Sequence, residues 1–199
     1  MTATTGSAGV PPGHLAVTVW FLECRRPTDG PPRPAPAGAT LVRAHAPDPA
    51  YYRFLYDATG EPWLWYGRRR ISPQQLARWL ADPAMELFVP MVDGVPAGML
   101  ELDRGPVPAC EIAYLGLRPG FIGRGLGPWL LDRAVRIAFA GGAERVTLNT
   151  CSLDHPKALD TYRAGGFEIL RREERIEPDP RAAGILPRTA GPHVPYAGP

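Results

Sequence analysis

The chain has 199 residues, of which 45% are hydrophobic and 21% charged, the balance of a globular protein with about one domain. Its formal net charge of +2 is too small to argue for nucleic-acid binding. The sequence has no run of the ~18 apolar residues that a membrane span needs and no basic N-terminal segment followed by an apolar one, so we expect a soluble cytoplasmic protein.

Proline and glycine are frequent, with 25 Pro and 22 Gly, and they cluster near both ends of the chain. Segments of this composition cannot bury enough apolar surface to offset the entropy lost on ordering. We therefore expect a flexible arm over residues 1–14, one domain over 15–176 and a Pro/Gly-rich tail over 177–199. On this view, deleting residues 1–12 or 182–199 leaves the thermal midpoint nearly unchanged.

The first half of the domain shows local signals for both helices and strands. Ser72 and Gln75 form a capping box at the start of a helix, and Asp93-Gly94 favours a tight hairpin. The predicted elements are strands over 15–23 and 39–44, helices over 49–56 and 73–81, and strands over 86–92 and 95–103.

The second half alternates between strands and helices. Two glycine pairs, Gly141-Gly142 and Gly165-Gly166, are expected to end the helices. A β-meander followed by a β-α-β-α-β run predicts an α/β fold with a mixed sheet. The predicted elements are strands over 111–117, 145–151 and 167–172, and helices over 125–140 and 156–164.

A glycine-rich loop, R-P-G-F-I-G-R-G-L-G, spans residues 118–127 before the helix over 125–140. Small residues at a helix entrance expose unpaired N–H groups beside the positive end of the helix dipole, which makes an anion site. The glycines could instead only shape a turn, but three at alternate positions exceed what one turn requires. They match neither the Walker pattern nor the dinucleotide pattern G-x-G-x-x-G.

Two motifs in this half carry a family resemblance. Residues 122–127 resemble the pyrophosphate loop Q/R-x-x-G-x-G/A of the GNAT acetyltransferases, with Ile122 at the first position. Residues 155–167 resemble the family segment N-x-x-A-x-x-x-Y-x-x-x-G-F, with His155 at the Asn position. The resemblance implies a GNAT-like α/β fold, in which a mixed, largely antiparallel central sheet is flanked by helices and splayed strands form a CoA cleft.

The resemblance also implies an activity and its cosubstrate. We expect an N-acetyltransferase that transfers an acetyl group from acetyl-CoA, by direct attack, to a primary amine of a small molecule or peptide, without a metal. The alternative is a non-catalytic CoA-binding or protein-interaction module, because Ile122 and His155 depart from the family pattern. The expected CoA-binding residues are Leu115, Leu117, Ile122, Gly123, Arg124, Gly125, Gly127, His155 and Ala158.

Two residues are candidates for proton transfer. Tyr162, at the position of the family's acid, can donate a proton to a leaving thiolate, or it can be a core tyrosine. Glu111, which opens a strand beside the acyl site, can accept the ammonium proton, or it can be a solvated residue at a strand end. Glu101 and water are the alternatives for the base. A backbone N–H within residues 115–117 is expected to polarise the thioester carbonyl.

The remaining signals concern compartment and partners. Cys24, Cys110 and Cys151 fit neither a disulfide framework nor a zinc site, and Lys157 as the single lysine suggests a GC-rich bacterial genome. We expect acetyl-CoA and an amine acceptor as partners, and neither nucleic acid nor a membrane. A homodimer is possible, because the sequence does not indicate the oligomeric state. The segment 61–66, with Glu61, Trp63, Trp65 and Tyr66, can form an aromatic and acidic wall for a cationic amine, or core aromatics.

Overall fold

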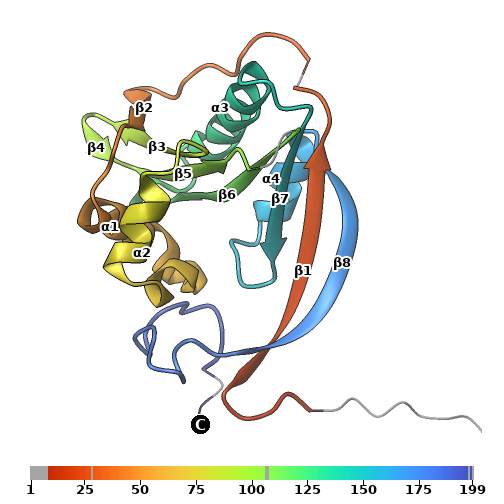
Figure 1. The fold of residues 1–199 in the computed structure, drawn as a ribbon. Coiled ribbons are helices and arrows are strands. Elements are labelled where there is room, and N and C mark those ends of the chain that lie inside the picture. The colour runs from red at the N-terminus through yellow and green to blue at the C-terminus, as the bar shows by residue number, and fades with distance from the viewer. Residues whose placement is uncertain (1–8, 28, 106–107, 197, 199) are drawn as a thin grey trace, which may run out of the picture.

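The computed structural model describes residues 9–196 and 198, apart from 28, 106 and 107 (Figure 1). Its strands and helices follow the predicted order closely along the chain. The elements are β1 (His14–Cys24), β2 (Ala39–Ala44), α1 (Pro49–Gly60), η1 (Glu61–Trp63), η2 (Gly67–Arg70), α2 (Pro73–Leu80), β3 (Met85–Val92), β4 (Val95–Pro96), β5 (Gly98–Asp103), β6 (Ala109–Leu117), η3 (Pro119–Phe121), α3 (Leu126–Ala140), β7 (Arg145–Cys151), α4 (Ala158–Ala164) and β8 (Glu168–Pro178).

The structure confirms the predicted features that depend on only a few consecutive residues. The Ser72 hydroxyl accepts the Gln75 N–H at 3.2 Å and the Gln75 side chain accepts the Ser72 N–H at 2.8 Å, which is the predicted capping box of α2. Asp93 and Gly94 have φ of +49° and +79°, the left-handed backbone that a tight hairpin needs. The single strand expected over 95–103 is instead two strands, β4 and β5, on either side of Ala97.

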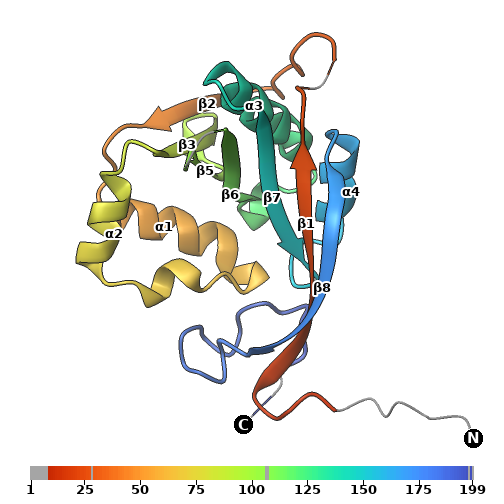
Figure 2. The same cartoon turned by 45° about the vertical axis from the view of Figure 1, so that its right-hand side comes forward.

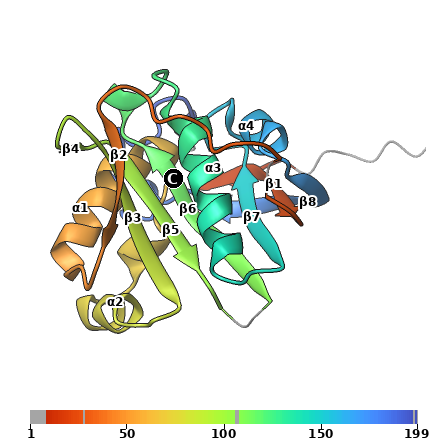
Figure 3. The same cartoon turned by 90° about the horizontal axis from the view of Figure 1, so that it is seen from above.

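The sheet is mixed and largely antiparallel, in the order β2-β3-β5-β6-β7-β1-β8, with the short β4 paired to β3. Among the described pairs, β6 and β7 are parallel and the others antiparallel. Helices α1 and α2 lie against one face of the sheet and α3 against the other (Figures 2 and 3). The predicted fold class is confirmed.

The N-terminal strand lies where its place in the sequence does not suggest. A run of β-α-β-α-β taken in chain order would set β8 beside β7, but β1 lies between them and pairs with both in antiparallel fashion. In the register, Trp20 of β1 faces Thr150 of β7 on one side and Arg172 of β8 on the other. A strand's own pattern does not name its partners, so only the folded chain shows this insertion.

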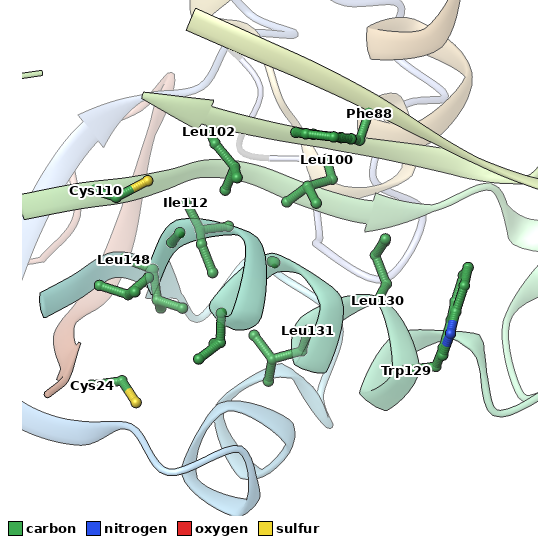
Figure 4. Close-up of a cluster of buried hydrophobic side chains, with 14 of the residues drawn as sticks. Cys24, Phe88, Leu100, Leu102, Cys110, Ile112, Trp129, Leu130, Leu131 and Leu148 are labelled. Atoms are coloured by element: carbon green, nitrogen blue, oxygen red, sulfur yellow. The ribbon is translucent and has the colours of Figure 1, made fainter. Parts of the chain in front are cut away.

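Two apolar clusters fix the sheet between its helices. The cluster on the α3 face includes Leu100, Ile112 and Leu130, each at most 4% exposed (Figure 4). The cluster on the other face packs α1 and α2 on the sheet and includes Leu55 and Leu76, both fully buried. The apolar sides of α1, α2 and α3 therefore face the sheet.

The segment after β8 folds back onto the domain below α1 and α2 (Figure 1). Leu186 and Ala190, each 3% exposed, pack with Leu15 and Leu64 in a third apolar cluster. The expectation that residues 182–199 make no core contacts is therefore wrong, because composition alone hides these buried residues. Most of the expected arm, residues 1–8, lies outside the described residues, and the domain boundaries stay a prediction.

Candidate functional site

Strands β6 and β7 separate after a short paired stretch. Residues 109–111 pair with residues 145–147, and the register ends there. From residue 112 to 117, the edge of β6 that faces β7 pairs with no strand among the described residues, and Figure 1 shows the two strands diverging. An open edge of this kind offers backbone N–H and C=O groups to an extended ligand. Leu115 and Leu117, two of the expected CoA-binding residues, lie in this stretch.

A β-bulge in β6 sets which side chains face which side of the sheet. Leu102 of β5 is opposite Ile112 whereas Glu101 is opposite Tyr114, so Ala113 is the extra residue. The bulge inverts the alternation of side chains. As a result Ile112 packs in the cluster on the α3 face and Tyr114 packs against the cluster on the α1 face.

Gly116 has a packing role next to this bulge. A Cβ on Gly116 would lie 2.7 Å from Cγ2 of Thr59 and 2.9 Å from Cη2 of Trp65, closer than side chains tolerate. The glycine therefore lets the indole ring of Trp65 approach the open stretch of β6. Gly116 itself pairs with Met99, and the extra residue of the bulge is Ala113.

The predicted phosphate loop is open and ends at α3. Gly123 and Gly125 have φ of +84° and +77°, and a Cβ on Gly123 or Gly127 would meet nothing within 4 Å. The N–H groups of Gly123, Arg124 and Gly125 donate to none of the residues that the structure describes. The Ile122 N–H is already bonded to the Pro119 carbonyl at 3.3 Å. Free amides at a helix N-terminus suit a phosphate group.

Tyr162 lies on α4 behind the end of β7. Its ring packs edge-on against Phe167 at 6.2 Å between centroids, and its hydroxyl bonds to none of the described residues. Burial raises the pKa of Tyr162, and the nearby carboxylate of Asp154 and thiol of Cys151 add to this rise. The phenol therefore keeps its proton at neutral pH, as an acid must.

His155 and Ala158 lie in the turn that leads into α4. Nδ1 of His155 accepts the Lys157 N–H at 3.1 Å, and the imidazole packs against Trp63 at 5.2 Å. The helix begins at Ala158 rather than at Pro156. His155 thus bonds within the turn just before α4 and makes no side-chain cap of the helix itself.

The two carboxylates considered as bases have different surroundings. Glu101 is fully buried, forms an ion pair with Arg68 and accepts the Tyr52 hydroxyl, so its charge is already compensated. Glu111 is exposed and lies opposite Asp103 in the register. Partial desolvation raises the pKa of Glu111 and the Asp103 charge adds to this, while Arg68 opposes it. Glu111 is the more available proton acceptor.

Glu111 shares a side of the sheet with Tyr114. Cys110 and Ile112, its neighbours before the bulge, belong to the cluster on the α3 face, so the side chain between them points to the α1 face. Cys110 itself is buried, and burial raises the pKa of its thiol to about 11. Cys151 is only half-buried, and its thiol pKa is raised to about 12, chiefly by burial.

Each face of the sheet carries a hollow near the diverging strands. The first, here called the α1 cavity, has a volume of about 640 Å³ and is lined by Tyr56, Leu64, Trp65, Tyr66, Gly67, Arg70, Ile71 and Tyr114. The second, called the α3 groove, has about 510 Å³ and is lined by Asp29, Pro31, Arg33, Pro128, Leu131, Asp132, Arg136, Lys157, Asp160, Thr161, Ala164 and Gly165. The described residues contain no group of three or more His, Cys, Asp or Glu that could hold a metal ion.

The predicted aromatic and acidic wall exists only in part. Trp65 and Tyr66 line the α1 cavity, whereas Trp63 packs against the imidazoles of two histidines. The Glu61 carboxylate pairs with Arg69 at 2.6 Å and does not line the cavity. Tyr114 was missed, because nothing in its local pattern separates it from an ordinary strand residue. The run of three arginines at 68–70 could be a solvated face or an anion contact by sequence, and Arg70 lines the cavity.

Comparison with known families identifies the architecture. Residues 49–167 match the model of the Acetyltransferase (GNAT) family. The chain belongs to this family. The match covers the predicted phosphate loop and the α4 segment, and none of the helices in the described part of the chain is long and apolar enough to cross a membrane.

Solved structures of GNAT proteins share the fold. A GCN5-related N-acetyltransferase from Kribbella flavida has a TM-score of 0.57 and 22% identity over 86% of this chain and 63% of its own. A GCN5-related N-acetyltransferase from Sphaerobacter thermophilus has a TM-score of 0.59 and 18% identity, over 84% of this chain and 52% of its own. An aminoglycoside acetyltransferase from an uncultured soil metagenomic sample, in complex with sisomicin, has a TM-score of 0.54 and 17% identity. That alignment covers 64% of this chain and 87% of the other. The chain thus spans under two thirds of the first two proteins. No curated protein sequence matches it.

Proposed function

We propose that this GNAT protein is an N-acetyltransferase that moves an acetyl group from acetyl-CoA to a primary amine of a small molecule or peptide. One observation carries the proposal: the open edge of β6 over residues 112–117 leads directly into a loop whose amides at Gly123, Arg124 and Gly125 are free. A thioester carrier with an extended amide-containing arm and a pyrophosphate fits this continuous path.

The residues present fit the parts of acetyl-CoA. The free loop amides and the positive end of α3 suit the pyrophosphate, and the open β6 edge suits the peptide-like arm. The α3 groove begins at Pro128, next to the loop, and Arg33 and Lys157 on its rim supply cations for a further phosphate. When bound, the carrier supplies the activated acetyl group.

The surrounding residues provide the proton transfers of a direct attack. The amine nitrogen forms a bond to the acetyl carbon as the carbon–sulfur bond breaks, and backbone N–H groups within residues 115–117 stabilise the carbonyl oxygen. Glu111 takes the proton that the ammonium group loses before the attack, directly or through water, and releases it to solvent. Tyr162 gives its proton to the departing sulfur and regains the proton that the nitrogen loses as the amide forms.

Release of free CoA thiol over a panel of primary amines tests the proposal. Acetyl-CoA consumption that depends on an amine, with the acetylated amine found by mass spectrometry, is the expected result. Tight CoA binding without thiol release on any amine would instead identify a non-catalytic CoA-binding module. The test must separate these two outcomes because Ile122 and His155 depart from the family pattern.

A Gly125→Asp substitution should weaken CoA binding by roughly 10- to 100-fold, the worth of charged hydrogen bonds. The change puts a side chain at φ of +77° and a negative charge beside the proposed pyrophosphate site. Titration calorimetry with CoA measures the effect. Gly142→Asp is the matched control, because Gly142 has φ of +89° and open space but lies at the other end of α3. Equal affinities for both variants would refute the loop as the phosphate site.

A Glu111→Gln substitution should lower turnover by about 10²-fold at neutral pH, the low end for a positioned base. The loss should shrink as the pH rises, because the amine then loses its proton without help. Rate measurements between pH 6 and about pH 10, the amine's own range, give the profile. Glu144→Gln, which changes an exposed glutamate before β7, is the control.

The same variant should be more stable than the wild type at neutral pH. Because the pKa of Glu111 is raised in the folded state, the folded chain binds more protons and loses stability as the pH rises above the ordinary range of a carboxyl group. Glutamine removes this loss, and because solvent screens the charge of an exposed residue the gain is small, roughly a few tenths of a kcal/mol. Thermal melts at pH 4 and 7 should show the gain at pH 7 only, and a gain at both would point to another cause.

A further inference from the structure

Three successive arginines in η2 have different environments. Arg68 is paired with the buried Glu101, and Arg69 is paired with Asp57 at 2.7 Å and with Glu61 at 2.6 Å. Arg70 is exposed, lines the α1 cavity, and forms no hydrogen bond or ion pair with any residue that the structure describes. Its guanidinium is the cation of this run whose donors remain available to a ligand.

The walls of the α1 cavity are aromatic and carry little charge. The rings of Tyr56, Trp65 and Tyr114 pack on one another with centroids 4.9–5.7 Å apart. Arg70 is the charged residue among those that line the cavity in the described part of the chain. Flat aromatic walls suit an apolar body, and a guanidinium at the rim suits a carboxylate.

Most acidic groups near the cavity already have partners. Besides Glu101 and Glu61, Glu177 of β8 accepts the Tyr66 hydroxyl at 3.4 Å and faces Arg175 at 3.8 Å, and Asp154 accepts the Trp65 indole N–H at 3.5 Å. Glu111 is the exception, and it serves the amine as the proposed base. No carboxylate lines the cavity in the described residues. A polycationic acceptor would therefore meet an arginine without a carboxylate to bind it.

The cavity also adjoins the proposed reaction site. Tyr114 belongs to the open stretch of β6, and the indole of Trp65 lies directly over Gly116 in the same stretch. Glu111 points to this side of the sheet as well. An acceptor in the cavity would thus have one end at β6, where its amine is needed, and its other end toward Arg70.

We infer that the acceptor is an amine that also carries a carboxylate, bound by Arg70, on an apolar or aromatic body that packs against the half-buried rings of Trp65 and Tyr114. The inference rests on the proposed acetyl transfer for the role of the amine. It selects amino-acid-like acceptors over polyamines and other polycations.

Matched pairs of acceptors test the inference. Phenylalanine is compared with phenylalaninamide, and 4-(aminomethyl)benzoate with benzylamine, so that each pair differs in the carboxylate. The wild type should show kcat/KM at least about 10-fold higher for the acid of one pair or both. Arg70→Gln should lower kcat/KM for the preferred acid roughly 10- to 100-fold, the usual worth of a charge-assisted contact. It should leave the neutral partner unchanged, with Arg70→Lys between the two.

Binding of the acetylated products gives a readout that needs no turnover. N-acetylphenylalanine and 4-(acetamidomethyl)benzoate are titrated against the CoA-bound protein by calorimetry, beside the acetylated neutral partners. Arg78→Gln is the control, because Arg78 is an exposed arginine on the nearby α2.

The two readouts separate the inference from the proposed function. Carboxylate-dependent binding that Arg70→Gln abolishes and Arg78→Gln retains supports the inference even without thiol release, an outcome that would refute the transferase alone. Equal binding and turnover of the acid and neutral partners, or an equal loss for both on Arg70→Gln, would overturn the carboxylate site.

Discussion

Replacing Tyr162 by phenylalanine is expected to lower turnover by roughly 10²- to 10⁴-fold, the usual worth of a positioned acid, with little change in CoA binding. Phenylalanine keeps the ring that packs against Phe167, and the lost hydroxyl bonds to none of the described residues. The substitution therefore removes the proton donor and leaves the packing of the ring unchanged. A thiol of ordinary pKa, about 8.5, is mostly protonated at neutral pH, so a phenol that protonates the sulfur as charge develops assists its departure.

Thiol release on the best acceptor and calorimetry with CoA measure the two effects separately. Tyr196→Phe, which changes a tyrosine that is 37% exposed in the C-terminal segment, is the control and should leave both unchanged. Turnover of Tyr162→Phe at the wild-type rate would make Tyr162 a packing residue. The proton would then come from solvent or from the amine itself.

The features predicted correctly are those whose chemistry lies within a few consecutive residues. The capping box of Ser72 and Gln75, the hairpin at Asp93-Gly94 and the open loop around Gly125 each follow from local hydrogen bonding or local backbone geometry. The residues that match the family, 49–167, include all three features. Short-range rules therefore recover the elements and the open glycine-rich loop.

The features that the sequence did not predict depend on distant partners. Nothing in β1 indicates that it lies between β7 and β8, because its apolar pattern would suit several neighbours. The bulge at Ala113, which sends Tyr114 to the α1 face, appears only when β5 is placed beside β6. The environment of Arg70 likewise depends on the pairing of its two neighbours with Glu101 and Glu61.

The order of the C-terminal segment also depends on contacts that the sequence does not predict. Its proline and glycine content predicts a tail, yet Arg181 is 4% exposed and Asp179 is fully buried. The Arg181 guanidinium donates to the Asp179 carboxylate at 2.8 Å and to the carbonyls of Val194 at 2.8 Å and Pro195 at 3.0 Å. One buried arginine thus closes the segment on itself, which composition cannot reveal.

Arg181→Ala is therefore expected to destabilise the protein by roughly 3–5 kcal/mol, because it removes the cation that compensates a buried carboxylate. For a chain of this size the thermal midpoint should fall by roughly 6–20 °C. The segment also holds the wall of the α1 cavity, since the Gly191 N–H bonds to the Glu61 carbonyl at 3.2 Å and Leu186 packs with Leu64. At temperatures where the variant stays folded, the acceptor KM should rise more than the Kd for CoA.

Thermal melts and acceptor kinetics of Arg181→Ala are compared with Arg188→Ala, which removes an exposed arginine from the same segment. The control should melt like the wild type, because an exposed side chain without buried partners contributes little. A midpoint for Arg181→Ala within about 2 °C of the wild type would mean that the segment does not hold the domain together, because that shift corresponds to at most about 1 kcal/mol. A normal melt with a raised acceptor KM would instead confine the role of the segment to the cavity wall.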